Sequence, residues 1–335
     1  MNMDNQQYTA SPDGLLTVSP SPHERRRVST SSVMIDVLIA LMPATIWGCV
    51  VFGWRAGLIV LVSVLSSVLF ELLTQLILHR PVTISDCSAA VTGLLLGLNL
   101  SASVPIYVPV VGAAFAIIVV KQIFGGIGKN IMNPALAARV FLMLAWTDKM
   151  SDFPAPNGVD AVASATPMVA LKSGELSASL GDLFFGHVGG CIGEVSALML
   201  LIGGAYLLIR RVISWHIPVT FLGTVAILTF LFPVGGADRV EFMLASLLGG
   251  GLMLGAFFMA TDYVTSPVTP VGRLIFGATC GALVVFLRYF SGYNEGVSFA
   301  ILIMNALVWY LDMVGKPRVF GKKRFEKKAQ TGGGK

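Results

Sequence analysis

Charged residues are scarce in this chain. Asp, Glu, Lys and Arg make up 12% of its 335 residues, whereas a soluble globular domain carries roughly 25%. Apolar and aromatic residues (AVILMFWYC) make up 55%. So little charge excludes an ordinary water-soluble enzyme, a disordered tail and a nucleic-acid-binding module. It indicates an integral membrane protein whose side chains mostly face lipid or other helices.

Cysteine and histidine are also rare. The chain has 4 of each. No two cysteines form a CxxC pair, and no HExxH or nucleophile-elbow motif is present, so we expect no metal site and no catalytic residue built by this chain alone. The cysteines lie far apart, at Cys49, Cys87, Cys191 and Cys280.

Long apolar segments predict the fold. A membrane helix needs about 20 apolar residues, and residues 1–32 lack the features of a cleavable signal peptide, so the first apolar segment is expected to remain as a helix. We predict an all-α polytopic membrane protein with about ten transmembrane helices. They are Asp36–Phe52, Ala56–Leu78, two helices within Cys87–Val120 divided at Ser101–Pro105, Pro134–Trp146, Glu194–Ile209, Ile217–Phe232, Phe242–Met259, Val271–Leu287 and Val297–Leu311.

The distribution of charge predicts the orientation. Eleven of the 23 basic residues lie in Arg25–Arg27 or after residue 315, whereas residues 147–190 hold two Lys against five acidic residues, a net charge of −3. Cytoplasmic segments carry the basic excess. We therefore expect a cytoplasmic tail at 1–32, a first transmembrane repeat at 33–146, an extracytoplasmic segment at 147–190, a second repeat at 191–315 and a basic cytoplasmic tail at 316–335.

The two halves have the same order of apolar segments. Short matches support the comparison, such as Phe52-Gly-Trp-Arg with Ile213-Ser-Trp-His, and Ile131-Met-Asn-Pro with Ile303-Met-Asn-Ala. Five helices per half would give two inverted repeats, an arrangement that usually frames a site between discontinuous helices near the middle of the bilayer.

A glycine-rich run, Gly125-Gly-Ile-Gly-Lys129, lacks the GxxxxGK[ST] pattern of a phosphate-binding loop. We interpret it as a helix break with close backbone packing, with its counterpart in the second half near Thr261–Pro270. The alternative is a site for an ion or for a second, noncovalent flavin, because unwound backbone inside a membrane must line a cavity or be covered by protein.

The extracytoplasmic segment contains Asp160-Ala-Val-Ala-Ser-Ala-Thr166, followed by Pro167 and Lys172. The residues by themselves are typical of a loop, in which Thr-Pro starts a turn or a short helix. This element resembles the flavinylation site of the RnfD/NqrB family, the membrane subunits of Rnf and of sodium-pumping NADH:quinone oxidoreductase complexes.

In that family the threonine of a D-x-x-[ST]-x-A-T element carries FMN through a phosphoester bond made by a dedicated flavin transferase. Asp160, Ala165 and Thr166 match the element, whereas Ala163 and Ser164 differ from its usual residues. The resemblance implies covalent FMN on Thr166, with Asp160, Ser164 and Ala165 around it. The charge of Lys172 would favour a reduced, anionic flavin by Coulomb attraction.

Other segments carry the same resemblance, which covers residues from about 33 to 315. They are Lys121–Ala135, Gly189–Glu194, Phe257–Asp262 with Thr265–Pro267, and Tyr293–Leu302.

The resemblance implies a function. The chain would be a membrane subunit of an ion-translocating oxidoreductase of the ferredoxin:NAD type, a translocase that is not catalytic alone. Its FMN would relay electrons coupled to Na+ or H+ movement, with riboflavin as the second flavin. Partners would include another flavoprotein, iron–sulfur subunits, the flavin transferase and lipid, but no nucleic acid. The location would be the bacterial inner membrane, with both termini cytoplasmic.

Several ionisable residues lie near or inside the predicted spans, namely Glu71, Asp86, Lys121, Arg139, Glu194 and Asp262. Most are interpreted as charges at the membrane interface or at contacts with other proteins of the complex. Asp262 is the exception, because Thr261 and Thr265 add oxygen ligands beside two prolines, and hard cations prefer oxygen ligands. These three residues are the candidate ion path.

Two other functions fit the same features. A solute channel or secondary transporter also has inverted repeats and broken helices. A structural anchor that has lost its flavin is the third hypothesis.

Overall fold

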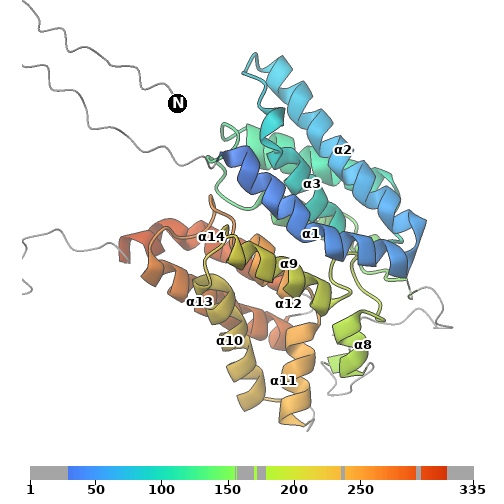
Figure 1. Cartoon of the computed structure of the whole chain (residues 1–335), viewed down its shortest axis with the longest axis vertical. Helices are drawn as coiled ribbons and strands as arrows, with labels where there is room; N and C mark the ends of the chain where they lie inside the picture. The colour runs from blue at the N-terminus through green and yellow to red at the C-terminus, as the bar shows by residue number, and fades with distance from the viewer. Residues whose placement is uncertain are drawn as a thin grey trace, which may run out of the picture.

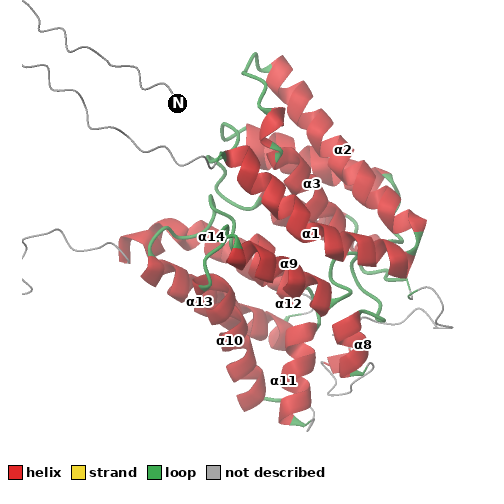
Figure 2. Cartoon of the chain, viewed as in Figure 1, coloured by secondary structure: helices red, strands yellow, loops and turns green. Residues whose placement is uncertain are grey.

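The computed structural model describes residues 29–154, 156, 170–171, 179–234, 238–291 and 296–314. Helices, turns and bends make up this part of the chain, and it contains no strand (Figure 2). The prediction of an all-helical membrane protein is therefore confirmed.

The first half contains α1 (Thr30–Phe52), α2 (Trp54–Ile77), the short 3-10 helix η1 (Ile84–Asp86), α3 (Ser88–Leu98), α4 (Tyr107–Ala114), the π-helix η2 (Phe115–Gln122), α5 (Pro134–Ala145) and α6 (Thr147–Met150). The second half contains α8 (Leu180–Phe185), α9 (Ala197–Ile209), α10 (His216–Leu231), α11 (Arg239–Leu248), α12 (Leu252–Leu254), the π-helix η3 (Gly255–Met259), α13 (Pro270–Phe290) and α14 (Val297–Val314).

Helix length and composition identify a multi-pass membrane protein. Within the described residues, α1, α2, α13 and α14 are long and apolar enough to span a bilayer, and α11 with α12 and η3 forms one further candidate, bent by 60°. Five more apolar segments are shorter, at 10–17 residues. Each predicted span overlaps one of these elements, but ten complete crossings stay a prediction.

Two boundaries differ from the sequence prediction. The segment Phe242–Met259, predicted as one helix, is broken because Gly250 and Gly251 both adopt a left-handed backbone with φ of 66°. Glycine takes this conformation without steric cost. The helix predicted from Glu194 begins only at Ala197, so Glu194 lies in the preceding loop.

The halves of the chain lie side by side (Figure 1). Helix α1 packs against α9, and α5 packs against α14. The similar tetrapeptides at Phe52 and Ile213 occupy equivalent places, at the α1–α2 and α9–α10 junctions. This arrangement agrees with the inverted repeat, which remains a prediction.

Glycines allow close helix packing inside each half. A Cβ atom on Gly93 of α3 would lie 2.7 Å from the Val64 Cα of α2, and one on Gly277 of α13 would lie 2.8 Å from the Ile217 carbonyl oxygen of α10. Small residues are needed at such contacts because van der Waals packing, not exclusion from water, holds helices together in lipid.

Candidate functional site

The predicted flavin element lies outside the described residues. This applies to Asp160, Ser164, Ala165, Thr166 and Lys172 alike. Nearby, Leu171 is buried with Leu183 of α8 and with Phe242 and Ala245 of α11. The chain is therefore attached to the helical body five residues after Thr166.

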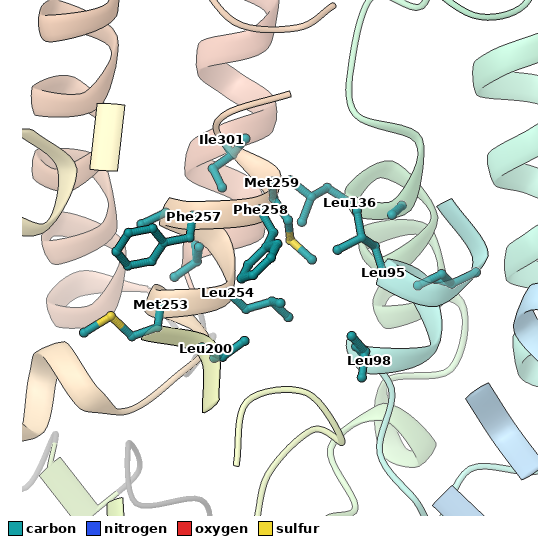
Figure 3. Close-up of a cluster of buried hydrophobic side chains, with 14 of the residues drawn as sticks. Leu95, Leu98, Leu136, Leu200, Met253, Leu254, Phe257, Phe258, Met259 and Ile301 are labelled. Atoms are coloured by element: carbon teal, nitrogen blue, oxygen red, sulfur yellow. The ribbon is translucent and has the colours of Figure 1, made fainter. Parts of the chain in front are cut away.

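Two helix ends from different halves meet inside the protein. Helix α3 ends before Asn99, and η3 ends at Met259, whose sulfur accepts a hydrogen bond from the Asn99 amide at 3.7 Å. Figure 3 shows Leu95 and Leu98 of α3 opposite Phe258 and Met259 of η3. The apolar residues around this meeting point are buried, so it lies in the core of the protein.

A buried ion pair lies next to this point. Arg139 of α5 donates to the Glu194 carboxylate at 2.8 Å, to the Asn99 side-chain oxygen, and to the sulfur of Cys191 at 3.4 Å. Arg139 is 4% exposed and Glu194 is 9% exposed. Both residues were interpreted as interfacial charges, and that interpretation is wrong, because the loop before α9 carries Glu194 into the bundle.

The loop before α9 lies between the end of α3 and the glycine break at Gly250 and Gly251, which follows α11. The backbone N–H groups of Ile192 and Gly193 donate to the carbonyls of Leu100 and Leu98 at 3.0 and 2.8 Å. On the other side, a Cβ on Gly251 would lie 2.3 Å from the Glu194 carboxylate. The segment 191–194 therefore provides hydrogen-bond partners for the carbonyl groups at the end of α3. Unwound backbone inside a membrane requires such partners.

A second buried ion pair connects α2 with η2. Lys121 lies 2.8 Å from the Glu71 carboxylate and donates to the Ser88 hydroxyl at 2.6 Å. The amides of Gln75 and Gln122 also donate to Glu71. Glu71 is 1% exposed and Lys121 is 3% exposed. The interfacial interpretation is wrong here too, because both side chains are buried inside the protein and pair with each other there.

The sequence contains a signal for this site that the interfacial interpretation overlooked. The buried polar residues of α2 are Ser63, Ser67, Glu71 and Gln75, which recur every four residues. Residues at i and i+4 share one face of a helix. A polar stripe on an otherwise apolar span indicates a face turned toward protein.

A small cavity opens beside Lys121, and we call it the inner cavity because its residues lie toward the predicted cytoplasmic side. Its volume is about 90 Å³. A cavity needs on the order of 10–15 Å³ by this measure to hold one water molecule, so the inner cavity has room for several waters or a partly hydrated cation. Its polar lining consists of Ser88, Thr92, Lys121, Asn130, Asn133, Thr261 and Asp262.

The candidate ion residues are only partly brought together. The Thr265 hydroxyl donates to the Asp262 carboxylate at 3.0 Å, whereas the Thr261 hydroxyl donates to the backbone oxygen of Phe257. Burial raises the pKa of Asp262 above its ordinary value, and the bonds from Thr265 and from two backbone N–H groups oppose this rise. Asp262 is thus a carboxyl group with a weakened preference for the charged form.

Three amide side chains lead from the inner cavity toward Arg139, and we call Asn99, Asn133 and Asn305 the amide line. The Asn133 side chain donates to the Met259 carbonyl at 3.3 Å, and its backbone N–H donates to the Asn305 side-chain oxygen at 3.1 Å. Asn305 also donates to the Thr265 carbonyl at 2.9 Å. Polar groups therefore continue from Asp262 to the Arg139–Glu194 pair.

The glycine-rich run forms a break, as predicted. Gly125, Gly126 and Gly128 have φ of 113°, 92° and 84°, between the end of η2 and the start of α5. The break near Thr261 likewise follows the π-helix η3 and precedes a proline-initiated helix, α13. Within the described part of the chain, no group of three or more His, Cys, Asp or Glu could hold a metal ion.

These features define a class of protein. It is a multi-pass membrane protein with interrupted helices, two buried ion pairs and a polar line through its core.

Comparison with known proteins identifies the family. The model of the NQR2, RnfD, RnfE family matches residues 17–321. The chain is 46% identical to the D subunit of the Na(+)-translocating ferredoxin:NAD(+) oxidoreductase complex of Acetobacterium woodii, covering 94% of this chain and 98% of that protein. It is 40% identical to the D subunit of the proton-translocating ferredoxin:NAD(+) oxidoreductase complex of Clostridium ljungdahlii, covering 92% and 97%. It is 38% identical to the D subunit of the ion-translocating oxidoreductase complex of Stutzerimonas stutzeri, covering 88% and 93%.

The chain belongs to the NQR2, RnfD, RnfE family.

Proposed function

We propose that this chain is the D subunit of an ion-translocating oxidoreductase complex of the ferredoxin:NAD type, active only with its partner subunits. The observation that carries the proposal is the similarity to the D subunits of such complexes over nearly the full length of both chains. The partners would be another flavoprotein and iron–sulfur subunits in a bacterial inner membrane. Relatives are named for sodium and for proton translocation, so the cation is Na+ or H+.

Thr166 is proposed to hold FMN through a phosphoester bond. When bound, FMN supplies the capacity to accept and pass on electrons, while the protein positions the ring and adjusts its potential. The role of Thr166 is to hold the phosphate, and the role of Lys172 is to place a positive charge beside the flavin.

The inner cavity is the place where a second, noncovalent flavin would bind. The donors of Lys121, Asn130 and Asn133 and the apolar walls match the polar edge and flat body of an isoalloxazine. Pockets for small ligands usually have volumes of about 300–1,000 Å³, and this cavity has about 90 Å³. A flavin does not fit a cavity of this size, so the proposal assigns no role to a flavin there.

The ion path is proposed to begin in the inner cavity at Asp262, to pass Thr265, which bonds to that carboxylate, and to follow the amide line. Carboxylate, hydroxyl and amide oxygens are the ligands that hard cations prefer. Thr261 contributes from the cavity wall. The Arg139–Glu194 pair lies at the end of this line and would close it, since a guanidinium repels a cation until the pair rearranges.

The test is covalent flavin on this chain. In the purified complex, flavin fluorescence should migrate with the chain on a denaturing gel, and the peptide containing Thr166 should gain the mass of FMN less water. Thr166→Ala should abolish the signal. Ser151→Ala, which removes an exposed hydroxyl elsewhere in the segment 147–190, is the control and should keep it.

An unmodified Thr166 peptide in active complex would reject the flavin proposal. In that case the solute channel or secondary transporter becomes the better interpretation, because the interrupted helices and the polar line fit it equally well.

A further inference from the structure

A second cavity lies at the end of α9, on the predicted cytoplasmic side, and we call it the arginine cavity. Its volume is about 590 Å³, which is in the range of small-ligand sites. It is lined by the end of α9, the α9–α10 connection, the linker after η3 and the first turn of α13. Its polar and aromatic lining consists of Arg211, Ser214, Trp215, Thr261, Tyr263, Ser266 and Arg273.

The two arginines bring unneutralised positive charge to this cavity. Neither Arg211 nor Arg273 forms a salt bridge with an acidic residue within the ranges that the structure describes. The Arg273 Nε donates to the Pro267 carbonyl at 2.9 Å, which leaves its two terminal nitrogens for another acceptor. Both guanidinium groups are therefore available to an anion.

The acidic residues nearby are engaged elsewhere. Asp36 accepts from Tyr206 and Arg210, Asp262 accepts from Thr265, and Asp312 accepts from the backbone N–H groups of Val268 and Thr269. The anion for the arginine cavity must therefore come from outside these elements.

Arg211 occupies a position that usually belongs to glycine. Helix α9 ends in a Schellman motif, in which the N–H groups of Arg211 and Val212 donate to the carbonyls of Leu208 and Leu207 at 3.0 and 2.9 Å. Arg211 has φ of 56°, in the left-handed region. Glycine is the common residue there, because a side chain strains the backbone.

Interaction with the helix C-terminus does not by itself explain this arginine. Arg210, the C-cap residue of α9, already places a cation beside the last carbonyl groups. Strain at a particular position is often retained for function. The arginine at 211 thus supports a binding role for its side chain.

The surroundings favour a lipid headgroup. Trp215 and Tyr263 are 55% and 53% exposed, and Ile209, Val268 and Val271, which lie within two residues of lining residues in the sequence, are also exposed apolar residues. Aromatic residues of this kind concentrate at membrane interfaces, and apolar surface next to a charged cavity suits acyl chains. Basic pockets between membrane helices on the cytoplasmic side bind anionic lipids.

We propose that the arginine cavity binds the phosphate group of an anionic phospholipid of the inner leaflet, through Arg211 and Arg273. Guanidinium groups bind phosphate oxygens in pairs of parallel hydrogen bonds. The lipid would connect α9, α10 and α13, which meet at this cavity. The proposed phosphate ligands, Arg211 and Arg273, belong to neither the flavin site nor the ion path, although Thr261 and Tyr263 line both this cavity and the inner cavity.

The test uses the assembled complex, freed of lipid by detergent exchange. Binding of phosphatidylglycerol, phosphatidylcholine and inorganic phosphate is measured by native mass spectrometry. Arg211→Gln and Arg273→Gln should each weaken phosphatidylglycerol binding by about fivefold, a size expected for one basic residue at an anionic membrane surface. The double variant should weaken it by roughly 25-fold, and phosphatidylcholine binding should not change.

Arg210→Gln is the matched control. It removes the same charge one residue away, but Arg210 pairs with Asp36, so phosphatidylglycerol affinity should stay at the wild-type value. Arg211→Gly checks folding. It should leave thermal stability in lipid-free detergent equal to or above that of the wild type, because glycine accepts the left-handed backbone, while lipid affinity falls as in Arg211→Gln.

Three results would overturn the proposal. The first is unchanged phosphatidylglycerol affinity in the double variant. The second is tight binding of inorganic phosphate that excludes the lipid, which would make this a site for soluble phosphate. The third is loss of another protein of the complex from the double variant with lipid binding intact, which would make the arginines a protein contact.

Discussion

At the scale of single residues, Asp262 determines the expected pH dependence of ion movement. Burial raises the pKa of its carboxyl, and the Thr265 hydroxyl lowers it by stabilising the charged form. Cation binding needs the carboxylate, so translocation should fall as pH decreases through this raised pKa. The folded state also holds this proton more tightly than the unfolded chain, so the group's contribution to stability decreases as pH rises through the same range.

Thr265→Val should move the acidic limit of translocation to higher pH by on the order of one unit, because the carboxylate loses a hydrogen bond. The measurement is cation uptake by vesicles containing the complex, as a function of pH. Thr45→Val in α1 is the control, since that hydroxyl donates to the backbone carbonyl of Leu41 and lies outside the proposed path. Identical profiles for both variants would remove Asp262 from the ion path.

The Glu71–Lys121 pair allows a prediction about stability. Glu71→Gln leaves Lys121 buried without its counter-charge, which should lower the free energy of unfolding by about 3–5 kcal/mol. Lys121→Gln added to it should recover part of the loss. Thermal unfolding of the purified protein in detergent measures both.

Asp36→Asn serves as the comparison for that pair. Its partner Arg210 has a side chain that is 55% exposed, and exposed pairs contribute about 0–1 kcal/mol. An equal loss in Glu71→Gln and Asp36→Asn would contradict the view that the buried pair stabilises the α2–η2 contact.

At the scale of elements, close packing of α3 on α2 keeps Asn99 near Met259 and Arg139. Gly93→Ala would place a Cβ 2.7 Å from the Val64 Cα and 2.8 Å from the Ser63 carbonyl oxygen. Backbone cannot yield cheaply, so the variant should lose about 1–3 kcal/mol of stability. Gly223→Ala in α10 meets no atom within 4 Å and should gain up to about 1 kcal/mol from helix propensity. Melting temperatures that change in the same direction would refute this account of the α2–α3 contact.

At the scale of the whole molecule, the charge distribution predicts which ends face the cytoplasm. In a variant without the four native cysteines, Asp148→Cys should react with a membrane-impermeant maleimide added outside intact cells. Lys129→Cys should react only after the membrane is made permeable. Both native side chains are exposed. Labelling of Lys129→Cys in intact cells would invert the proposed topology.

The sequence predicted most of the helices because a span needs only apolar residues over a sufficient length, which is a local property. It predicted one helix over Phe242–Met259, where the structure has a 60° bend. The glycines at 249–251 permit a bend. Only the tertiary structure shows that the Glu194 carboxylate packs against Gly251 at this bend. The interfacial interpretation of Glu71, Lys121, Arg139 and Glu194 failed for a related reason, since apolarity along the chain does not say which face meets protein.

The sequence by itself determined that this is a polytopic helical membrane protein, where its basic residues gather, and that Thr166 is the candidate flavin residue. Only the tertiary structure determined which polar and charged side chains meet inside the protein. Lys121 and Glu71 are 50 positions apart, and Glu194 and Arg139 are 55 apart. A buried charge in a membrane needs a partner, but only the packing of α2 on η2, and of the segment 191–194 between two broken helices, determines which partner it meets.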